Sequence, residues 1–273
     1  MLRVVGLWFL LLGLFACNET AEKEASIKME ETEGANEIVE EDASLDSLAQ
    51  IKVEELGIGI YKRLNNDNCV AFLEEYGAEH GENLVRMETD FGDILVRLYE
   101  DTPIHRASFL YLIERNYFAP TQIVRVVPGF VIQGGNSEEL EDQEQRFLIG
   151  KYTLPNEIKR QHIHKRGALA MSRSYENNPD KRSAPYDFYL VQGQKVSDAG
   201  LFQAEKKNGY SYSDEEKAIY KKAGGAPHLD GEHTVIGEII QGWDVVDKIA
   251  KVPTDDGEWP VKEVTVNMSV AAE

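Results

Sequence analysis

The sequence has few cysteines and few basic residues. Only Cys17 and Cys69 occur in 273 residues, and their spacing indicates neither a disulfide scaffold nor a metal site. Lysine and arginine together number 29 against 48 aspartates and glutamates, which gives a formal net charge of −19. No cluster of basic residues offsets this excess. Because phosphate backbones are bound by clustered lysines and arginines, the composition argues against a nucleic-acid-binding protein.

Long apolar runs are also missing, apart from one short stretch near the N-terminus. Residues 4–15 carry no charge, follow Arg3 and are too few to cross a bilayer as a helix. A positive start followed by a short apolar core is typical of a secretory signal. We therefore predict a signal peptide at residues 1–16.

The end of this stretch carries a more specific motif. Leu14-Phe15-Ala16-Cys17 resembles the bacterial lipobox, in which cleavage precedes a cysteine that then carries acyl chains. The resemblance implies lipidation of Cys17, and several acyl chains on one residue anchor a protein stably to a membrane. The alternative is an ordinary secretory signal with a chance cysteine at its cleavage site. We expect a cell-envelope protein, in the outer membrane rather than another membrane, that faces the periplasm or the cell surface.

Residues 17–48 are acidic and contain no aromatic residue. Their charge comes largely from Glu30, Glu31, Glu33, Glu40, Glu41 and Asp42, and the basic residues are Lys23 and Lys28. Such a segment cannot bury enough apolar area to offset its ordering entropy, and its like charges repel one another. The composition predicts a disordered tether. A second interpretation is that acids soon after Cys17 serve as an address for export to the cell surface.

The next segment, residues 49–83, is predicted to be an N-terminal extension that packs on the main domain. It contains apolar residues such as Ile51 and Val53, and Phe72 and Tyr76 indicate a short helix. Cys69 also lies here, and we expect it to be a small, partly buried side chain.

From residue 84 onward the pattern becomes that of short strands. Val85 and Met87 alternate with polar residues before a glycine-containing turn, and Ile94 and Val96 do so after it. Two such runs around a turn predict a β-hairpin. The chain closes on another alternating run over residues 264–270, which predicts a final strand.

Two helices are predicted among these strands. Thr102-Pro103 combines a preferred N-cap residue with a proline at the first helical position. Phe109, Leu112 and Ile113 would then share the buried face of this helix. A second helix is predicted over residues 243–250. Many short strands with two helices favour a mostly β fold, a closed barrel capped at its ends.

Four motifs follow one another in the order seen in a known family. They are RVVPGFVIQGG at 125–135, HKRGALAMSR at 164–173, DFYLVQ at 187–192 and HLDGEHTVIGEI at 228–239. Over residues 84–271 this order resembles that of the cyclophilin-type peptidyl-prolyl cis-trans isomerases. The resemblance implies an eight-stranded antiparallel closed barrel capped by two helices, and proline-containing polypeptides as partners. Nothing in the sequence calls for a cofactor or a metal, and we expect a monomer.

The family's reaction explains why these residue types matter. The peptide bond before proline has a rotation barrier of about 18–20 kcal/mol, so catalysis requires tighter binding of the twisted state than of either planar state. By resemblance, Arg125 donates a hydrogen bond to the prolyl nitrogen in that state, Phe130 forms the apolar floor for the proline ring, and Gln133 binds the substrate backbone. Without the motif, Arg125 would be interpreted as a structural ion-pair partner.

The remaining pocket residues are assigned by the same resemblance, and several depart from the family pattern. Leu229 and His233 would complete the wall, and His233 also fits a core histidine. Strand alternation places Val131 and Gln133 on one face and Phe130 on the other, unless the strand is irregular. The departures are Val131 for methionine, Ser172-Arg173-Ser174 for Ala-Asn-Ala, Asp187 for glutamine, Tyr189 for phenylalanine and His228 for tryptophan or phenylalanine. They affect substrate preference and rate more than the fold.

An insertion separates the third and fourth motifs. Residues 193–227 include Ser213, with Glu216 three positions later, which predicts a helix with a capping box that ends at Gly224-Gly225. The insertion is either a solvated loop, or a lid or partner surface near the pocket rim.

Two histidine pairs are candidate metal ligands. His162 and His164 are assigned to a solvated turn. His228 and His233 are five positions apart rather than four, and Asp230-Gly231 between them indicates a hairpin. We therefore predict no metal site.

Two functions remain open from the sequence. The first is an enzyme that isomerises X-Pro bonds in exported or cell-envelope proteins, favoured by Arg125, Phe130 and Gln133. The alternative is a catalytically weak module of the same fold that binds proline-containing chains as a chaperone or surface interaction protein, favoured by Arg173, Asp187 and the insertion.

Overall fold

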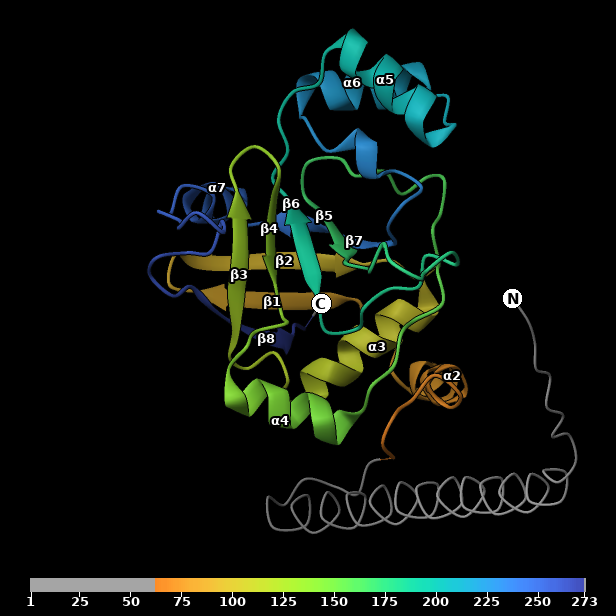
Figure 1. Ribbon diagram of the computed structural model, residues 1–273, viewed down its shortest axis with the longest axis vertical. Helices are drawn as coiled ribbons and strands as arrows, with labels where there is room; N and C mark the ends of the chain where they lie inside the picture. Colours follow the sequence, from red (N-terminus) through yellow and green to blue (C-terminus); the bar gives the residue numbers. More distant parts are fainter. Residues whose placement is uncertain (1–61, 273) are drawn as a thin grey trace, which may run out of the picture. The chain divides into compact units, whose positions relative to one another are not determined.

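The computed structural model describes residues 62–272, and its centre is a closed barrel of eight strands (Figure 1). Neighbouring strands are antiparallel, in the order β1-β2-β7-β5-β6-β4-β3-β8. The strands are β1 (Leu84–Thr89), β2 (Gly92–Leu98), β3 (Thr121–Val127), β4 (Val131–Gly134), β5 (Ala168–Met171), β6 (Phe188–Val191), β7 (Val235–Gln241) and β8 (Thr265–Val270). The predicted mostly β barrel is confirmed.

The chain ahead of residue 62 carries several predictions that lie outside the described residues. They are the signal peptide at 1–16, the tether at 17–48 with Cys17, and the first part of the extension at 49–83. These stay predictions. Within residues 62–272, no helix has both the length and the apolar character that a membrane crossing needs.

The first hairpin forms as its alternation predicts. β1 pairs with β2 from Leu84 opposite Arg97 to Thr89 opposite Gly92, so the turn falls at residues 90–91. Val85, Met87, Ile94 and Val96 are buried. In β8, Val266 and Met268 are buried but Val270 is 43% exposed, so the alternation of buried and exposed residues ends at Met268.

The Thr-Pro helix, α3 (Pro103–Glu114), begins where predicted but is capped by another residue. Thr102 occupies the N-cap position, yet its hydroxyl donates to the Tyr99 carbonyl at 3.3 Å and makes no cap hydrogen bond. The Glu157 carboxylate instead accepts from the backbone N–H groups of Ile104, at 3.1 Å, and His105, at 2.8 Å. It also binds the His105 ring at 2.6 Å. A residue 52 positions away thus caps the helix.

Residues 62–272 also contain α-helices that are neither the two capping helices nor part of the insertion. α3 and α7 (Trp243–Ile249) are the two predicted capping helices, and α2 (Cys69–Glu79) is the predicted extension helix, packed on α3. Cys69 is fully buried there rather than partly buried. The helix α4 (Leu140–Ile149) was not predicted. It buries only Asp142 and Ile149, so its sequence has no apolar stripe to reveal it.

The insertion folds into helices, as predicted. It contains α5 (Asp198–Asn208) and α6 (Asp214–Lys222), and its last residue begins a short 3-10 helix η1 (Pro227–Leu229). Figure 1 shows α5 and α6 together at one end of the barrel. The capping box of Ser213 and Glu216 is present. The two ends of the insertion meet at Gly193 and Gly225. Gly193 has a φ of +62°, and a Cβ added to it would lie only 2.5 Å from the Gly225 Cα. Only glycine fits this position.

The cap of α3 gives a stability prediction. Burial alone would raise the pKa of Glu157, but hydrogen bonds and charge interaction with His105 lower it overall. We expect Glu157→Gln to lower the free energy of unfolding by about 1–2 kcal/mol at pH 7, and Thr102→Val to lower it less. Since the pKa is lowered on folding, the effect of Glu157→Gln shrinks as the pH falls below about 4. Urea denaturation at several pH values measures this, and equal losses for both variants would contradict the assignment.

Candidate active site

Arg125 lies on β3, next to a register irregularity between Ile123 and Arg125. Its Nε donates to Glu258 Oε2 at 2.7 Å, and its Nη2 lies 2.6 Å from the same oxygen. Both side chains are about 40% exposed, at 38% and 43%. The Glu258 carbonyl in turn accepts from the Val126 N–H at 2.8 Å, which fixes the loop beside the strand. The two contacts to one carboxylate hold the guanidinium in one orientation.

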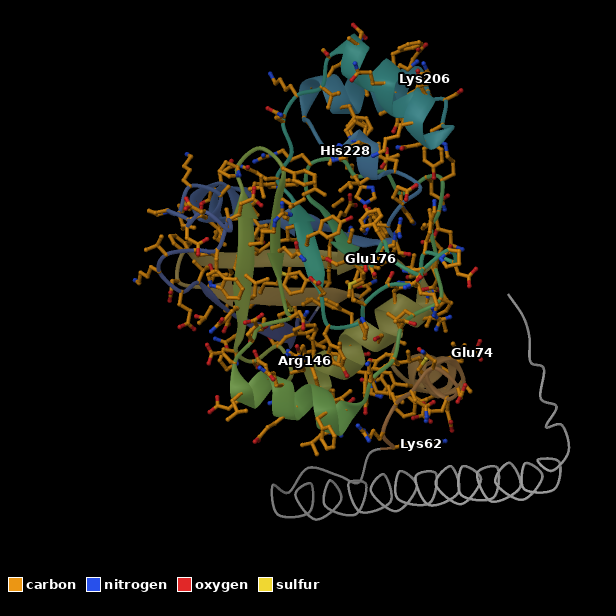
Figure 2. All side chains as sticks on the ribbon, viewed as in Figure 1. Lys62, Glu74, Arg146, Glu176, Lys206 and His228 are labelled. Carbon is orange, nitrogen blue, oxygen red and sulfur yellow. The ribbon has the colours of Figure 1, made fainter. Side chains whose placement is uncertain are left out.

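A cavity of about 290 Å³ opens beside Arg125 and brings most of the predicted site residues together. Its lining consists of Arg125, Phe130, Val131, Gln133, Ser172, Arg173, Tyr175, Asp187, Tyr189, Leu229 and His233. Ser174 and His228 are the predicted residues outside it. The Ser174 hydroxyl is bonded to the backbone of Glu176, and His228 lies between the insertion and the barrel, where it lines a neighbouring cavity (Figure 2).

Phe130 lines the same cavity as Val131 and Gln133, although strict strand alternation would place it on the opposite face. Phe130 precedes β4, and its N–H donates to the Val127 carbonyl at 3.0 Å, so it belongs to the turn between β3 and β4. This turn lets Phe130 face the same cavity as Val131 and Gln133. Val131, Tyr189 and Leu229 form one buried apolar cluster, and Phe130 packs against it.

Gln133 is held by polar groups on neighbouring strands. Its side-chain nitrogen donates to Asp187 at 2.9 Å and to Ser172 at 3.3 Å. Burial raises the pKa of Asp187, and the hydrogen bonds from Gln133 and Ser172 oppose that rise. With both amide hydrogens engaged, the side-chain oxygen of Gln133 remains as an acceptor for a backbone N–H.

Arg173 lines the cavity, but its charge is already paired. Its guanidinium donates to the Glu232 carbonyl at 2.6 Å, the Glu232 carboxylate at 2.5 Å and the Ser174 carbonyl at 3.0 Å. It also lies 4.2 Å from the ring centroid of Tyr175. Arg173 therefore holds the loop around residues 172–175 rather than presenting a free positive charge.

His233 is both a satisfied histidine and a cavity residue. Its Nδ1 lies 3.2 Å from the Met171 carbonyl, which makes Nδ1 the protonated nitrogen. Its Nε2, 2.7 Å from the Tyr175 hydroxyl, is then an acceptor. Burial, with His164 as the next contribution, lowers the pKa of His233 to about 4. The ring is neutral at pH 7. Sequence reasoning missed Tyr175, which is 65% exposed and belongs to no apolar pattern.

A buried hydrogen-bond network behind the cavity corrects two sequence interpretations. His164 is not in a solvated turn, because it is 1% exposed. Asp230 does not close a hairpin, since it follows the 3-10 helix η1 and is also 1% exposed. The Asp230 carboxylate accepts from the His164 N–H at 2.7 Å, from Tyr212 at 2.7 Å and from Tyr220 at 2.5 Å.

The same network reaches the cavity wall. His164 Nδ1 lies 2.8 Å from Asp230, and its Nε2 lies 3.0 Å from the Tyr189 hydroxyl. His162 is separate, bonded to Asp101 at 2.6 Å and stacked on Tyr99. Among residues 62–272, no three histidine, cysteine, aspartate or glutamate side chains are grouped to hold a metal ion.

A family model described as cyclophilin type peptidyl-prolyl cis-trans isomerase/CLD matches residues 84–270. The chain therefore belongs to the cyclophilin-type peptidyl-prolyl cis-trans isomerase family. The family recognition and the enzyme class predicted from the sequence are confirmed.

Individual relatives carry similar names. An Acinetobacter baylyi peptidyl-prolyl cis-trans isomerase is 31% identical over 172 residues, which cover 63% of this chain and 73% of that protein. A longer Streptococcus pyogenes protein, whose name combines a phosphatase with a peptidyl-prolyl cis-trans isomerase, is 30% identical over 223 residues. The match covers 76% of this chain but only 45% of that protein. The barrel is also similar to a crystal structure of a Cryptosporidium parvum cyclophilin type isomerase, with a TM-score of 0.50, 19% identity and coverage of 70% and 99% of the two chains.

The lowered pKa of His233 predicts a pH dependence of stability. Between about pH 6.5 and 4 the unfolded chain binds a proton on this ring that the folded chain does not, so the free energy of unfolding falls as the pH drops, by up to about 3 kcal/mol. His233→Asn should remove this part of the dependence while adding a constant loss from the missing contacts. Denaturant titrations from pH 7 to 4 give the slope of the free energy of unfolding against pH for wild type and for His233→Asn. Equal slopes for wild type and His233→Asn would contradict the prediction.

Proposed function

We propose that this chain accelerates cis–trans isomerisation of X-Pro bonds in exported or cell-envelope proteins, with Arg125 as the catalytic residue. One observation carries the proposal: a guanidinium held by Glu258 lines a cavity of about 290 Å³ that has an apolar floor. The cavity combines a hydrogen-bond donor, an apolar floor and a backbone acceptor in one place.

The chemistry follows from these groups. As the X-Pro bond twists, the prolyl nitrogen becomes pyramidal and its lone pair accepts a hydrogen bond. Glu258 engages one N–H each on Nε and Nη2 of Arg125, which leaves the N–H groups of Nη1 and the second one of Nη2 as donors to that nitrogen. Phe130, Val131 and Leu229 receive the proline ring, and the side-chain oxygen of Gln133 binds a substrate N–H. Neutral His233 shapes the wall and transfers no proton.

Removing the donor tests the catalytic role. We expect Arg125→Ala to lower kcat/KM for a short X-Pro peptide by about 10²–10³-fold, the usual loss for one donor to a transition state. Glu258→Gln should lower it less, because the donor remains but is oriented less firmly. A protease-coupled isomerisation assay measures each variant, and circular dichroism confirms that each is folded. If Arg125→Ala and wild type had the same kcat/KM, the catalytic assignment would be lost.

A second candidate is a proline-binding module with little turnover. Asp187 and Ser172 already engage the Gln133 amide nitrogen, which favours this alternative, since a substrate carbonyl cannot use that donor without displacing them. The same assay separates the two functions. Peptide binding without a kcat/KM above the uncatalysed rate would support the module.

The location of the protein is a further proposal, supported by the lipobox-like residues 14–17 and the acidic segment after them. We propose that lipidated Cys17 anchors the chain to a cell-envelope membrane, the outer membrane in a bacterium with two membranes.

Substitution of the acyl acceptor tests this anchor. We expect Cys17→Ser to move the protein from the membrane fraction to the soluble fraction, because no acyl chains can be attached. Cys69→Ser is the matched control. Its thiol is buried, so fractionation should not change. Cell fractionation with immunoblotting provides the readout, and a Cys17→Ser protein that stays with the membranes would rule out lipid anchoring at this residue.

A further inference from the structure

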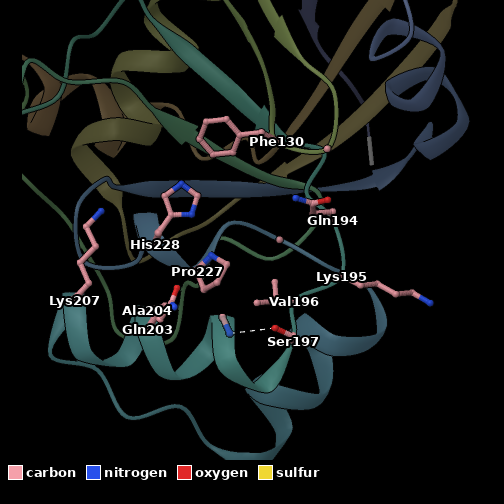
Figure 3. A pocket seen from close by; sticks show the side chains of 13 residues that line it. Phe130, Gln194, Lys195, Val196, Ser197, Gln203, Ala204, Lys207, Pro227 and His228 are labelled. Atoms are coloured by element: carbon pink, nitrogen blue, oxygen red, sulfur yellow. Dashed lines mark hydrogen bonds between the residues drawn. The ribbon is translucent and has the colours of Figure 1, made fainter.

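A second and larger cavity adjoins the proline site. It encloses about 530 Å³ and is lined by the turn at Gly129 and Phe130, the first residues of the insertion, one side of α5, and the segment at Pro227 and His228 (Figure 3). Phe130 lines both cavities. The ring centroids of His228 and Phe130 are 5.2 Å apart, at the boundary between the two cavities. The insertion thus extends the surface next to the active site.

The walls of this cavity, which we call the insertion cavity, are fixed to the barrel. Asn208, at the end of α5, donates to the Pro227 carbonyl at 2.7 Å, and the Tyr212 hydroxyl donates to the same carbonyl at 3.0 Å. On the opposite side, the Gln192 side chain accepts from the Gly129 N–H at 2.5 Å. Because both sides are held by hydrogen bonds, the cavity is preformed rather than the gap beneath a loose loop.

The charges of the insertion cavity differ from those of the protein as a whole. Its lining includes Lys195 and Lys207 and no aspartate or glutamate, in a chain of net charge −19. Within residues 62–272 neither lysine is in an ion pair, unlike Lys217 with Glu205 and Lys221 with Asp198 in the same insertion. Lys206 and Lys222 are also outside any ion pair among these residues, but they do not line the cavity. Unpaired positive charge in a concave site attracts negative groups.

The position of Lys207 suits an extended chain. Figure 3 shows Lys207 beside His228 at one end of the cavity, whereas Lys195, at the other end, directs its side chain away from the other lining residues. An extended polypeptide advances about 3.3–3.6 Å per residue. A chain with its proline ring on Phe130 can therefore place residues about two to five positions from that proline along the insertion cavity.

We propose that the insertion cavity binds the flanking segment of the proline-containing substrate and selects acidic side chains there through Lys207. This inference rests on the proposed function, because the flank is defined relative to a proline in the active site. It makes the insertion a specificity element that recognises an acidic polypeptide segment.

Peptides that differ only in their flanks test the inference. Each contains one Ala-Pro bond with glutamate, alanine or lysine at two to five positions either before or after the proline. On the side that enters the insertion cavity, we expect kcat/KM to be about three- to tenfold higher for glutamate than for lysine flanks. The preference should fall as the ionic strength rises from about 0.02 to 0.5 M, because salt screens exposed charges. The dissociation constant of each peptide is measured in parallel by fluorescence anisotropy.

Two charge reversals on α5 locate the effect. Lys207→Glu should abolish or invert the preference for acidic flanks. Lys206→Glu makes the same change in net charge at the neighbouring exposed residue, which is outside the cavity lining, and should keep the preference (Figure 2). Equal effects of the two variants would mean that overall charge acts rather than the cavity, and would overturn the inference.

The inference and the proposed function fail in different ways. Turnover of all peptides by the wild type without a flank preference overturns the inference and leaves the isomerase intact. Absence of turnover for every peptide overturns the proposed function. The inference is then decided by the dissociation constants, and equal constants for glutamate and lysine flanks reject it.

Discussion

The Asp230 carboxylate is buried between the barrel and the insertion, and a buried carboxylate is costly unless hydrogen bonds satisfy it. Its donors come from both sides: His164 before β5, and Tyr212 and Tyr220 in the insertion. His164 then contacts Tyr189 in the wall of the proline cavity. Satisfying one charge therefore joins three parts of the chain, which makes the insertion a fixed part of the site. The need to satisfy Asp230 also places η1, and with it His228 and Leu229, at the boundary between the two cavities.

The polar groups at the rim of the cavity beside Arg125 are also held by hydrogen bonds within the protein, although they are less buried than Asp230. Arg125 is held by Glu258, Gln133 by Asp187, and Arg173 by Glu232. In each pair, some donors and acceptors bind each other, and only the remaining ones can bind a substrate. Orientation is gained in this way, since a donor that is already aligned need not reorganise as the X-Pro bond twists. The exposed ion pair of Arg125 contributes little to stability, so its main effect is on geometry.

The sequence predicted the features that depend on local pattern or on a family motif. The β1–β2 hairpin, the start of α3 and the Ser213 capping box are set by neighbouring residues, and all three are present. The motif residues gather in one cavity, apart from Ser174 and His228. The cap of α3 by Glu157, the ion pair of Glu258 with Arg125 and the Asp230 network link residues far apart in the chain, and no local pattern encodes them. Helix α4 was missed for a related reason, because it buries too few apolar residues to show a period.

If the cavity beside Arg125 lowers the barrier to X-Pro rotation, exchange NMR on a peptide with one X-Pro bond detects the faster interconversion. Uncatalysed cis and trans forms interconvert in tens to hundreds of seconds. With wild-type protein at about one hundredth of the peptide concentration, we expect cis–trans exchange cross-peaks at mixing times below about one second. Peptide resonances that shift on binding, without exchange cross-peaks, would contradict it.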